Sequence, residues 1–143
     1  MIDSFKGKHA FLSNFYLIEI QFDGIIYNSV EHAYQASKTI DLSSRLMISK
    51  LETPGRAKRM GQLVPIRSDW EDVKLAVMTK LVETKFKDPF LRKKLIKTYS
   101  YELVEGNTWG DKFWGVCFGE GKNILGKLIM EIRTMLNMDL LDS

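Results

Sequence analysis

Several features that would narrow the function at once are missing from this sequence. It has one cysteine, Cys117, so no disulfide can form within the chain, and this fits a reducing compartment. No apolar run reaches the roughly 18 residues that a membrane-spanning helix needs. The first residues, Met1 to Phe5, lack the basic and apolar regions of a signal peptide. We therefore expect a cytoplasmic protein with no membrane partner.

Strong charge and metal-ligand clusters are also missing. The net charge of +3 suits an anionic ligand but is far from the signature of a nucleic-acid-binding protein. The basic run Arg56, Lys58 and Arg59 keeps a nucleic-acid partner as a weaker alternative, although such a run is usually a solvated face. His32 has no histidine or cysteine partner at metal-ligand spacing, so we predict no metal site. Nothing in the sequence indicates a cofactor.

The sequence contains no proline- or serine-rich linker, no low-complexity run and no repeat, so its 143 residues predict a single compact domain over 1–143. The runs Leu17–Phe22 and Ile25–Tyr27 flank Asp23-Gly24, which predicts a β-hairpin. Helical patterns dominate the remainder. We expect a mainly α (α+β) fold with a small N-terminal hairpin. Helices are expected over residues 29–38, 43 to about 51, 54–61, 70–87 and about 123–137, and another helix is expected to begin at Pro89. A short strand is expected at 101–104.

The predicted helix over residues 29–38 carries a row of polar side chains. Glu31, Tyr34, Gln35 and Lys38 follow i, i+3, i+4, i+7 spacing, so they share one face. A solvated helix would more often carry several charges of both signs. This face is therefore the candidate floor of a polar pocket.

A glycine-rich loop follows at residues 106–122. It contains Trp109, Asp111 and Trp114, and its aromatic residues argue against disorder. Glycines just before the last predicted helix would let backbone amides approach an anion, with Lys122 assisting. The loop lacks the Gly-Lys-Ser/Thr ending of a P-loop, so this phosphate signal is weak.

Motifs spread along most of the chain resemble those of the YbiA-like, or NADAR, family. They are Phe11-Leu12-Ser13-Asn14-Phe15-Tyr16, Ser29-Val30-Glu31-His32-Ala33-Tyr34-Gln35-Ala36-Ser37-Lys38, Arg59-Met60-Gly61, Arg67-Ser68-Asp69-Trp70, Asp111-Lys112-Phe113-Trp114-Gly115 and the stretch from Gly121 to Arg133. The resemblance runs from about Phe5 to Arg133. The chain departs from some family members at Val116-Cys117-Phe118, where a more glycine-rich or polar run can occur.

The resemblance implies a mostly helical YbiA-like fold and N-glycosidase activity on phosphorylated ribosyl compounds. The implied substrates are ribosylamino-pyrimidine phosphates of riboflavin biosynthesis, or ADP-ribose joined to guanine or arginine, including ADP-ribosylated nucleic acid or protein. Carried over by motif, the functional positions are Asn14, Glu31, Tyr34, Lys38, Trp70, Asp111 and Trp114.

The chemistry assigns roles to these residues. A carboxylate near the anomeric carbon stabilises oxocarbenium character and activates water, and Glu31 and Asp111 are the candidate pair. Lys38 offers a second route, because a neutral amine could attack C1 of a ring-opened ribosylamine and form an imine. The candidate substrate-binding residues that complete the site are Asn14, Tyr34, Gln35, Arg59, Arg67, Trp70, Trp114, Gly115, Lys122 and Asn123.

Structural explanations compete with these roles. Glu31 lies three residues after Asn28, so a capping box would explain it without catalysis. Lys38 lies near a helix end, where its charge could simply complement the helix dipole. Asp111 could be a turn residue. A non-catalytic module that binds NAD or ADP-ribose is the alternative function. The sequence sets neither the leaving group nor the oligomeric state.

Overall fold

The computed structural model describes residues 1–142 and is mainly helical, which confirms the expected fold class. Its helices are a 3₁₀ helix over Gly7–Leu12, α1 (Val30–Ser37), α2 (Leu42–Ser49), α3 (Pro54–Gly61), α4 (Trp70–Lys85), α5 (Pro89–Ile96) and α6 (Ile124–Asp142). Its strands are β1 (Ile20–Phe22), β2 (Ile25–Tyr27), β3 (Gly106–Asn107) and β4 (Val116–Cys117). Contacts within the chain define two units. One is Asn14–Lys85, and the other comprises Met1–Ser13 and the chain from Phe86 onward.

The Asn14–Lys85 unit begins with the predicted hairpin. Strands β1 and β2 are antiparallel, with Ile20 opposite Tyr27. The turn residues Asp23 and Gly24 have φ angles of 49° and 80°, the left-handed pair that a type I′ turn requires. Strand β1 is shorter than expected, because it begins at Ile20 rather than at Leu17.

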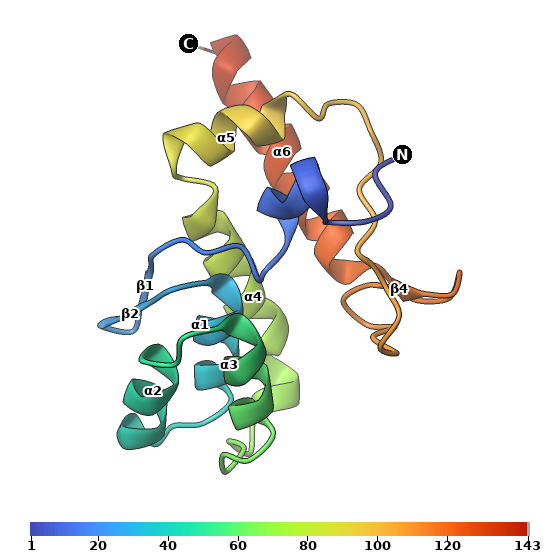
Figure 1. Ribbon diagram of the computed structural model, residues 1–143. Helices are drawn as coiled ribbons and strands as arrows, with labels where there is room; N and C mark the ends of the chain where they lie inside the picture. Colours follow the sequence, from blue (N-terminus) through green and yellow to red (C-terminus); the bar gives the residue numbers. More distant parts are fainter. Residues whose placement is uncertain (143) are drawn as a thin grey trace. The chain divides into compact units, whose positions relative to one another are not determined.

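Helix α1 is the centre of this unit, since α2, α3 and α4 all pack against it (Figure 1). Side-chain caps set the starts of two helices in this unit. Thr53 caps α3 through its side chain, and Pro54 occupies the first turn, where no backbone N–H is needed. Asp41 caps α2 in the same way. This helix begins at Leu42, one position before the expected start at residue 43. The apolar core of the unit includes Ile20, Val30, Ala33, Ile48, Ala57, Met78, Leu81 and Val82.

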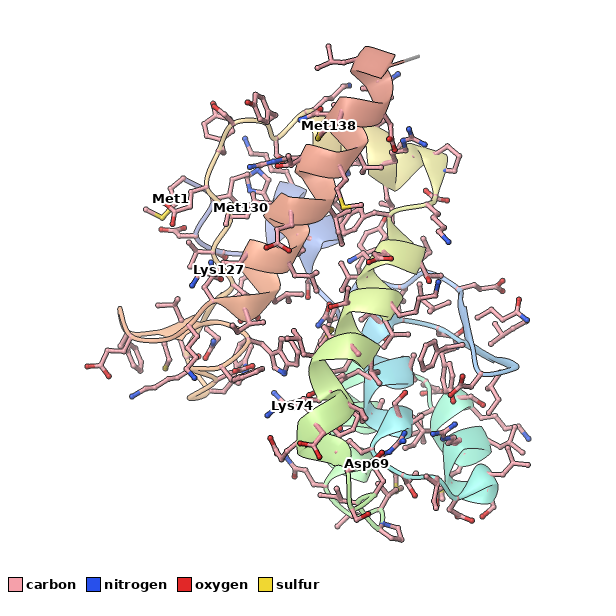
Figure 2. The ribbon with its side chains drawn as sticks, turned by 180° about the vertical axis from the view of Figure 1, so that it is seen from behind. Met1, Asp69, Lys74, Lys127, Met130 and Met138 are labelled. Carbon is pink, nitrogen blue, oxygen red and sulfur yellow. The ribbon has the colours of Figure 1, made fainter. Side chains whose placement is uncertain are left out.

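The second unit is built on α5 and α6, which pack together (Figure 1), and its buried apolar residues include Leu91, Leu95 and Ile129. Arg133 of α6 is 5% exposed, and its Nη1 donates to the carbonyl oxygens of Thr98 and Tyr101. These bonds fix the segment that follows α5 against α6. Lys127, Met130 and Met138 mark the course of α6 in Figure 2.

The structure differs from the sequence-based expectations at two places. The expected strand at residues 101–104 is a single bridge between Leu103 and Ile2. The glycine-rich loop contains the short parallel pair β3–β4, which was not expected.

Within residues 1–142, no helix combines the length and apolar character needed to cross a membrane. The single domain and the cytoplasmic location stay predictions.

Candidate functional site

Helix α1 carries its polar row in a buried environment. Glu31 and Gln35 are only 8% and 4% exposed. They lie one helical turn apart, and Nε2 of Gln35 donates a hydrogen bond to Oε2 of Glu31 over 3.1 Å. A buried carboxylate requires such donors, because a carboxylate without them pays the full cost of leaving water. The pair is therefore a fixed polar feature inside the unit.

The start of α1 excludes the capping-box explanation of Glu31. The Ser29 hydroxyl oxygen accepts a hydrogen bond from the backbone N–H of His32 at 3.1 Å, so Ser29 is the N-cap. In a capping box the acidic side chain occupies the third helical position, which here is His32. The alternative in which Asn28 is the cap and Glu31 closes the box is therefore wrong.

His32 ties the start of α1 to the chain just after α2 through its two ring nitrogens. Its Nδ1 lies 2.7 Å from the Ser29 hydroxyl, and its Nε2 lies 2.9 Å from the carbonyl oxygen of Leu51. The carbonyl can only accept, so Nε2 carries the proton and Nδ1 accepts from Ser29. Burial lowers the pKa of His32, which favours this neutral form.

Lys38 lies at the C-terminal cap of α1, and its backbone carbonyl accepts a 2.7 Å hydrogen bond from the N–H of Arg67. The side chain is half-buried, with Nζ 5.8 Å from the centre of the Tyr34 ring. Burial lowers the pKa of Lys38, the Glu31 carboxylate opposes this shift, and the charges of Lys58 and Lys74 lower the pKa further. A larger fraction of neutral amine is what a nucleophilic lysine needs.

Three further residues predicted for the site, Tyr34, Trp70 and Asn14, lie on α1 or contact it. The Tyr34 and Trp70 rings have centroids 5.1 Å apart, and Trp70 is 6% exposed. The carbonyl oxygen of Asn14 accepts from the backbone N–H of Glu31 at 3.0 Å, while its Nδ2 lies 3.5 Å from Sδ of Met78. The structure therefore brings these residues together around the first and last turns of α1.

Arg59 and Arg67 are the two arginines of this unit that were predicted to bind the substrate. Arg59 is exposed on α3. Arg67 forms a two-point ion pair with Asp69, with Nε 2.6 Å from Oδ1 and Nη2 3.1 Å from Oδ2. Sequence reasoning instead missed Lys58 and Lys74, whose charges act on Lys38. The sequence could have indicated them, because Lys58 shares a helix face with Gly61 and Lys74 shares one with Trp70.

The remaining predicted residues belong to the second unit. Oδ1 of Asp111 accepts from the backbone N–H groups of Phe113 and Trp114 at 3.1 and 2.9 Å. The backbone N–H and C=O of Asp111 both bond to the side chain of Asn107. Asp111 therefore organises a turn, as the structural explanation expects.

Gly115, Lys122 and Asn123 have local explanations in the loop. A Cβ at Gly115 would overlap the backbone of Glu105, so the parallel β3–β4 pair requires glycine there. The side chain of Asn123 bonds to the backbone of Leu103 and Glu105, which ties the start of α6 to the preceding segment. Lys122 is exposed, with Nζ 5.8 Å from the centre of the Phe113 ring. Binding roles for these three residues stay predictions.

Within the described chain, no group of three His, Cys, Asp or Glu side chains is arranged to hold a metal ion.

Comparison with known proteins supplies the family. The model of the NADAR domain matches residues 3–137. The chain is 40% identical over 140 residues to the N-glycosidase YbiA of Escherichia coli, covering 95% of this chain and 87% of the relative. A riboflavin biosynthesis protein of Vibrio vulnificus is 35% identical over 133 residues, which is 90% of this chain but 36% of that protein.

A solved structure agrees with these matches. The NMR structure of the Escherichia coli protein YbiA is similar with a TM-score of 0.87 and 36% identity, covering 100% of this chain and 89% of that chain. The identity and coverage are high enough to show common membership rather than a shared fold alone. The chain belongs to the NADAR domain family and is an enzyme of the N-glycosidase class.

Proposed function

We propose that this N-glycosidase cleaves the bond between C1 of a phosphorylated ribose or ADP-ribose and a nitrogen of a base or amine. The candidate substrates are ribosylamino-pyrimidine phosphates, and ADP-ribose joined to guanine or arginine in a small molecule, nucleic acid or protein. The riboflavin biosynthesis proteins among the relatives favour the first group. The observation that carries the proposal is the half-buried amine of Lys38. Burial lowers the pKa of this amine, and Glu31 is close enough for its charge to act on it.

Two routes are open to Glu31 and Lys38. In the first, the Glu31 carboxylate takes a proton from water, the water oxygen bonds to C1 and the C1–N bond breaks. The leaving nitrogen then accepts a proton, so one water is consumed. This route leaves Lys38 to stabilise the transition state or orient the sugar.

In the second route the sugar ring opens first, and the neutral Lys38 amine adds to C1. Glu31 carries a proton from the new ammonium to the departing nitrogen, and the C1–N bond breaks to leave an imine on Lys38. Water then hydrolyses the imine, which frees the sugar and restores the amine. The lowered pKa of Lys38 supports this route, because a protonated amine cannot attack.

Aromatic residues would hold the substrate in either route. The Tyr34 and Trp70 rings form a tilted pair beside Lys38, and aromatic rings of this kind suit contact with a planar base. We assign Asp111 and Trp114 to the reaction on the family resemblance, and treat residues 1–143 as one domain because the family model spans 3–137.

The test is an incubation of the protein with ADP-ribosylated guanosine, ADP-ribosyl-arginine and ribosylamino-pyrimidine phosphates, with products followed by mass spectrometry. Turnover of at least one compound is expected, and its loss in Glu31→Gln and Lys38→Met variants that keep their thermal melting would support the site. No turnover of any compound by folded protein would reject the proposal. Borohydride added during turnover separates the routes, since only the imine route leaves a covalent adduct on Lys38.

A further inference from the structure

Helices α3 and α4 each meet α1 through a defined contact. A Cβ added at Gly61 of α3 would overlap Oε1 of Gln35, so the α3 backbone lies directly against that side chain. On α4, Trp70 packs on Tyr34 with ring centroids 5.1 Å apart. Gln35 and Tyr34 are neighbours on α1, one turn before Lys38. These contacts identify which face of α3 and which face of α4 point toward α1.

A lysine lies on each of those faces. Lys58 precedes Gly61 by three residues, and Lys74 follows Trp70 by four, so each shares a helix face with the residue that contacts α1. Both lysines are partly buried, and the Lys74 side chain is 20% exposed. Figure 2 shows Lys74 in the first half of α4. By contrast, the side chain of Arg56 on α3 is 53% exposed.

The two lysines and Lys38 form a concentrated positive group. Lys58 and Lys74 are close enough to Lys38 for their charges to act on it. Acidic groups at this cluster include Glu31, which also acts on Lys38, and Glu71, whose Oε2 lies 2.6 Å from Nζ of Lys74. Glu71 is 79% exposed, and exposed ion pairs are weak and screened by salt. The three ammonium groups place several positive charges beside the proposed nucleophile.

We propose that Lys58 and Lys74 bind a phosphate group of the substrate next to Lys38. The inference rests on the proposed function for the identity of the substrate, and it names residues of the same site that the family motifs did not supply. A phosphate carries up to two negative charges near neutral pH and three acceptor oxygens, which several ammonium groups can share. An anion of this charge displaces Glu71 from Lys74 and offsets the repulsion among the three lysines. The lysines thereby select phosphorylated over unphosphorylated N-ribosides.

The first test measures binding without turnover. The full chain is titrated calorimetrically with inorganic pyrophosphate, together with a Lys58→Gln/Lys74→Gln double variant. The control is an Arg56→Gln/Lys80→Gln double variant, which removes the same charge from exposed positions of the same two helices. We expect the dissociation constant to rise at least about tenfold in the first variant and to stay within about twofold in the control. Equal weakening in both variants, or no binding by the wild type, overturns the proposal.

The second test separates phosphate binding from an influence on Lys38 alone. Kinetics are measured on a phosphorylated N-riboside and on its dephosphorylated counterpart. We expect Lys58→Gln/Lys74→Gln to raise KM for the phosphorylated compound only, and Lys58→Arg/Lys74→Arg to restore it. An unchanged KM with a shifted pH profile of kcat would show that the lysines only tune Lys38, and would overturn the inference.

The two tests also distinguish this inference from the proposed function. Pyrophosphate binding that depends on Lys58 and Lys74 supports the phosphate site even where no N-riboside is cleaved. Turnover that is retained with unchanged KM and unchanged pyrophosphate binding overturns the phosphate site and leaves the glycosidase proposal standing. Thermal melting followed by circular dichroism confirms that each variant is folded, and the two single variants replace the double variant where it is not.

Discussion

The amide nitrogen of Gln35 lies 3.1 Å from Oε2 of Glu31, while the amide oxygen of the same side chain faces Gly61. That oxygen is buried and accepts no hydrogen bond in the part of the chain that the structure describes. An unsatisfied buried acceptor costs about 1–3 kcal/mol. The side chain therefore keeps its donor on Glu31 at the expense of stability, which points to a positioning role for Gln35.

Replacing Gln35 by Met should separate stability from activity. The change removes the unsatisfied acceptor, which is favourable, and the donor to Glu31, which is unfavourable. These effects offset each other, so the free energy of unfolding should stay within about 1 kcal/mol of the wild type. The value of kcat/KM should fall at least about tenfold, because the carboxylate loses the group that orients it.

Urea unfolding and steady-state kinetics measure the two quantities. Gln62→Met is the matched control, since Gln62 is exposed at the C-terminal cap of α3. Full activity in Gln35→Met alongside an inactive Glu31→Gln would show that Gln35 does not position Glu31.

Gly61→Ala should destabilise the protein, because the new Cβ would overlap the Gln35 side chain. Overpacking of this kind costs about 1–3 kcal/mol. Gly55→Ala on the same helix is the control. Its Cβ would meet nothing closer than Oγ1 of Thr53 at 4.0 Å, so a gain of up to about 1 kcal/mol is expected.

The double variant Gly61→Ala/Gln35→Ala checks the cause. Shortening Gln35 makes room for the methyl group, so the two changes should be less than additive in urea unfolding. Additive losses would place the origin of the Gly61 effect elsewhere than at Gln35.

Sequence reasoning succeeds here where the signal is local. Asp23-Gly24 predicts the hairpin because few residues adopt its left-handed turn, and Thr53-Pro54 predicts the start of α3 because a side chain replaces missing backbone partners. The polar row on α1 follows from helical spacing alone. The capping box was wrong because the sequence does not decide between Asn28 and Ser29 as the cap. With Ser29 as the cap, Glu31 is no longer at the position that closes the box.

Features that depend on distant parts of the chain were missed. The parallel pair of Gly106–Asn107 with Val116–Cys117 has no periodicity to reveal it, and it is supported by side-chain hydrogen bonds of Asn107 and Asn123. The burial of Lys85 at the end of α4 was equally invisible, because a lysine at a helix end normally complements the dipole in solvent.

Lys85 should make stability depend on pH. It is 1% exposed, Nζ lies 5.6 Å from the centre of the Tyr16 ring, and burial lowers its pKa from 10.5 to about 7. The unfolded chain therefore binds more protons between pH 7 and 10.5, so the stability contributed by this residue rises with pH in that window. The rise should be about 2 kcal/mol between pH 7 and 9.

The variant Lys85→Met removes this dependence and should be more stable than the wild type at pH 7, with the difference shrinking by pH 9. Urea unfolding at both pH values measures it, and Lys87→Met, at an exposed position just after α4, should change little. A difference between Lys85→Met and wild type that stays constant with pH would mean that Lys85 is charged throughout.

Substitutions of Asp111 should separate its contribution to stability from its proposed role in catalysis. Its Oδ1 accepts from the backbone N–H groups of Phe113 and Trp114, and an asparagine side chain keeps an oxygen for that purpose. Asp111→Asn should therefore leave the free energy of unfolding within about 0.5 kcal/mol, whereas Asp111→Ala should lose about 1–2 kcal/mol. Our assignment of Asp111 to proton transfer predicts that Asp111→Asn lowers kcat by about 10² or more. Full activity in Asp111→Asn would leave this carboxylate as a turn residue, because only its charge and its proton are removed by that substitution.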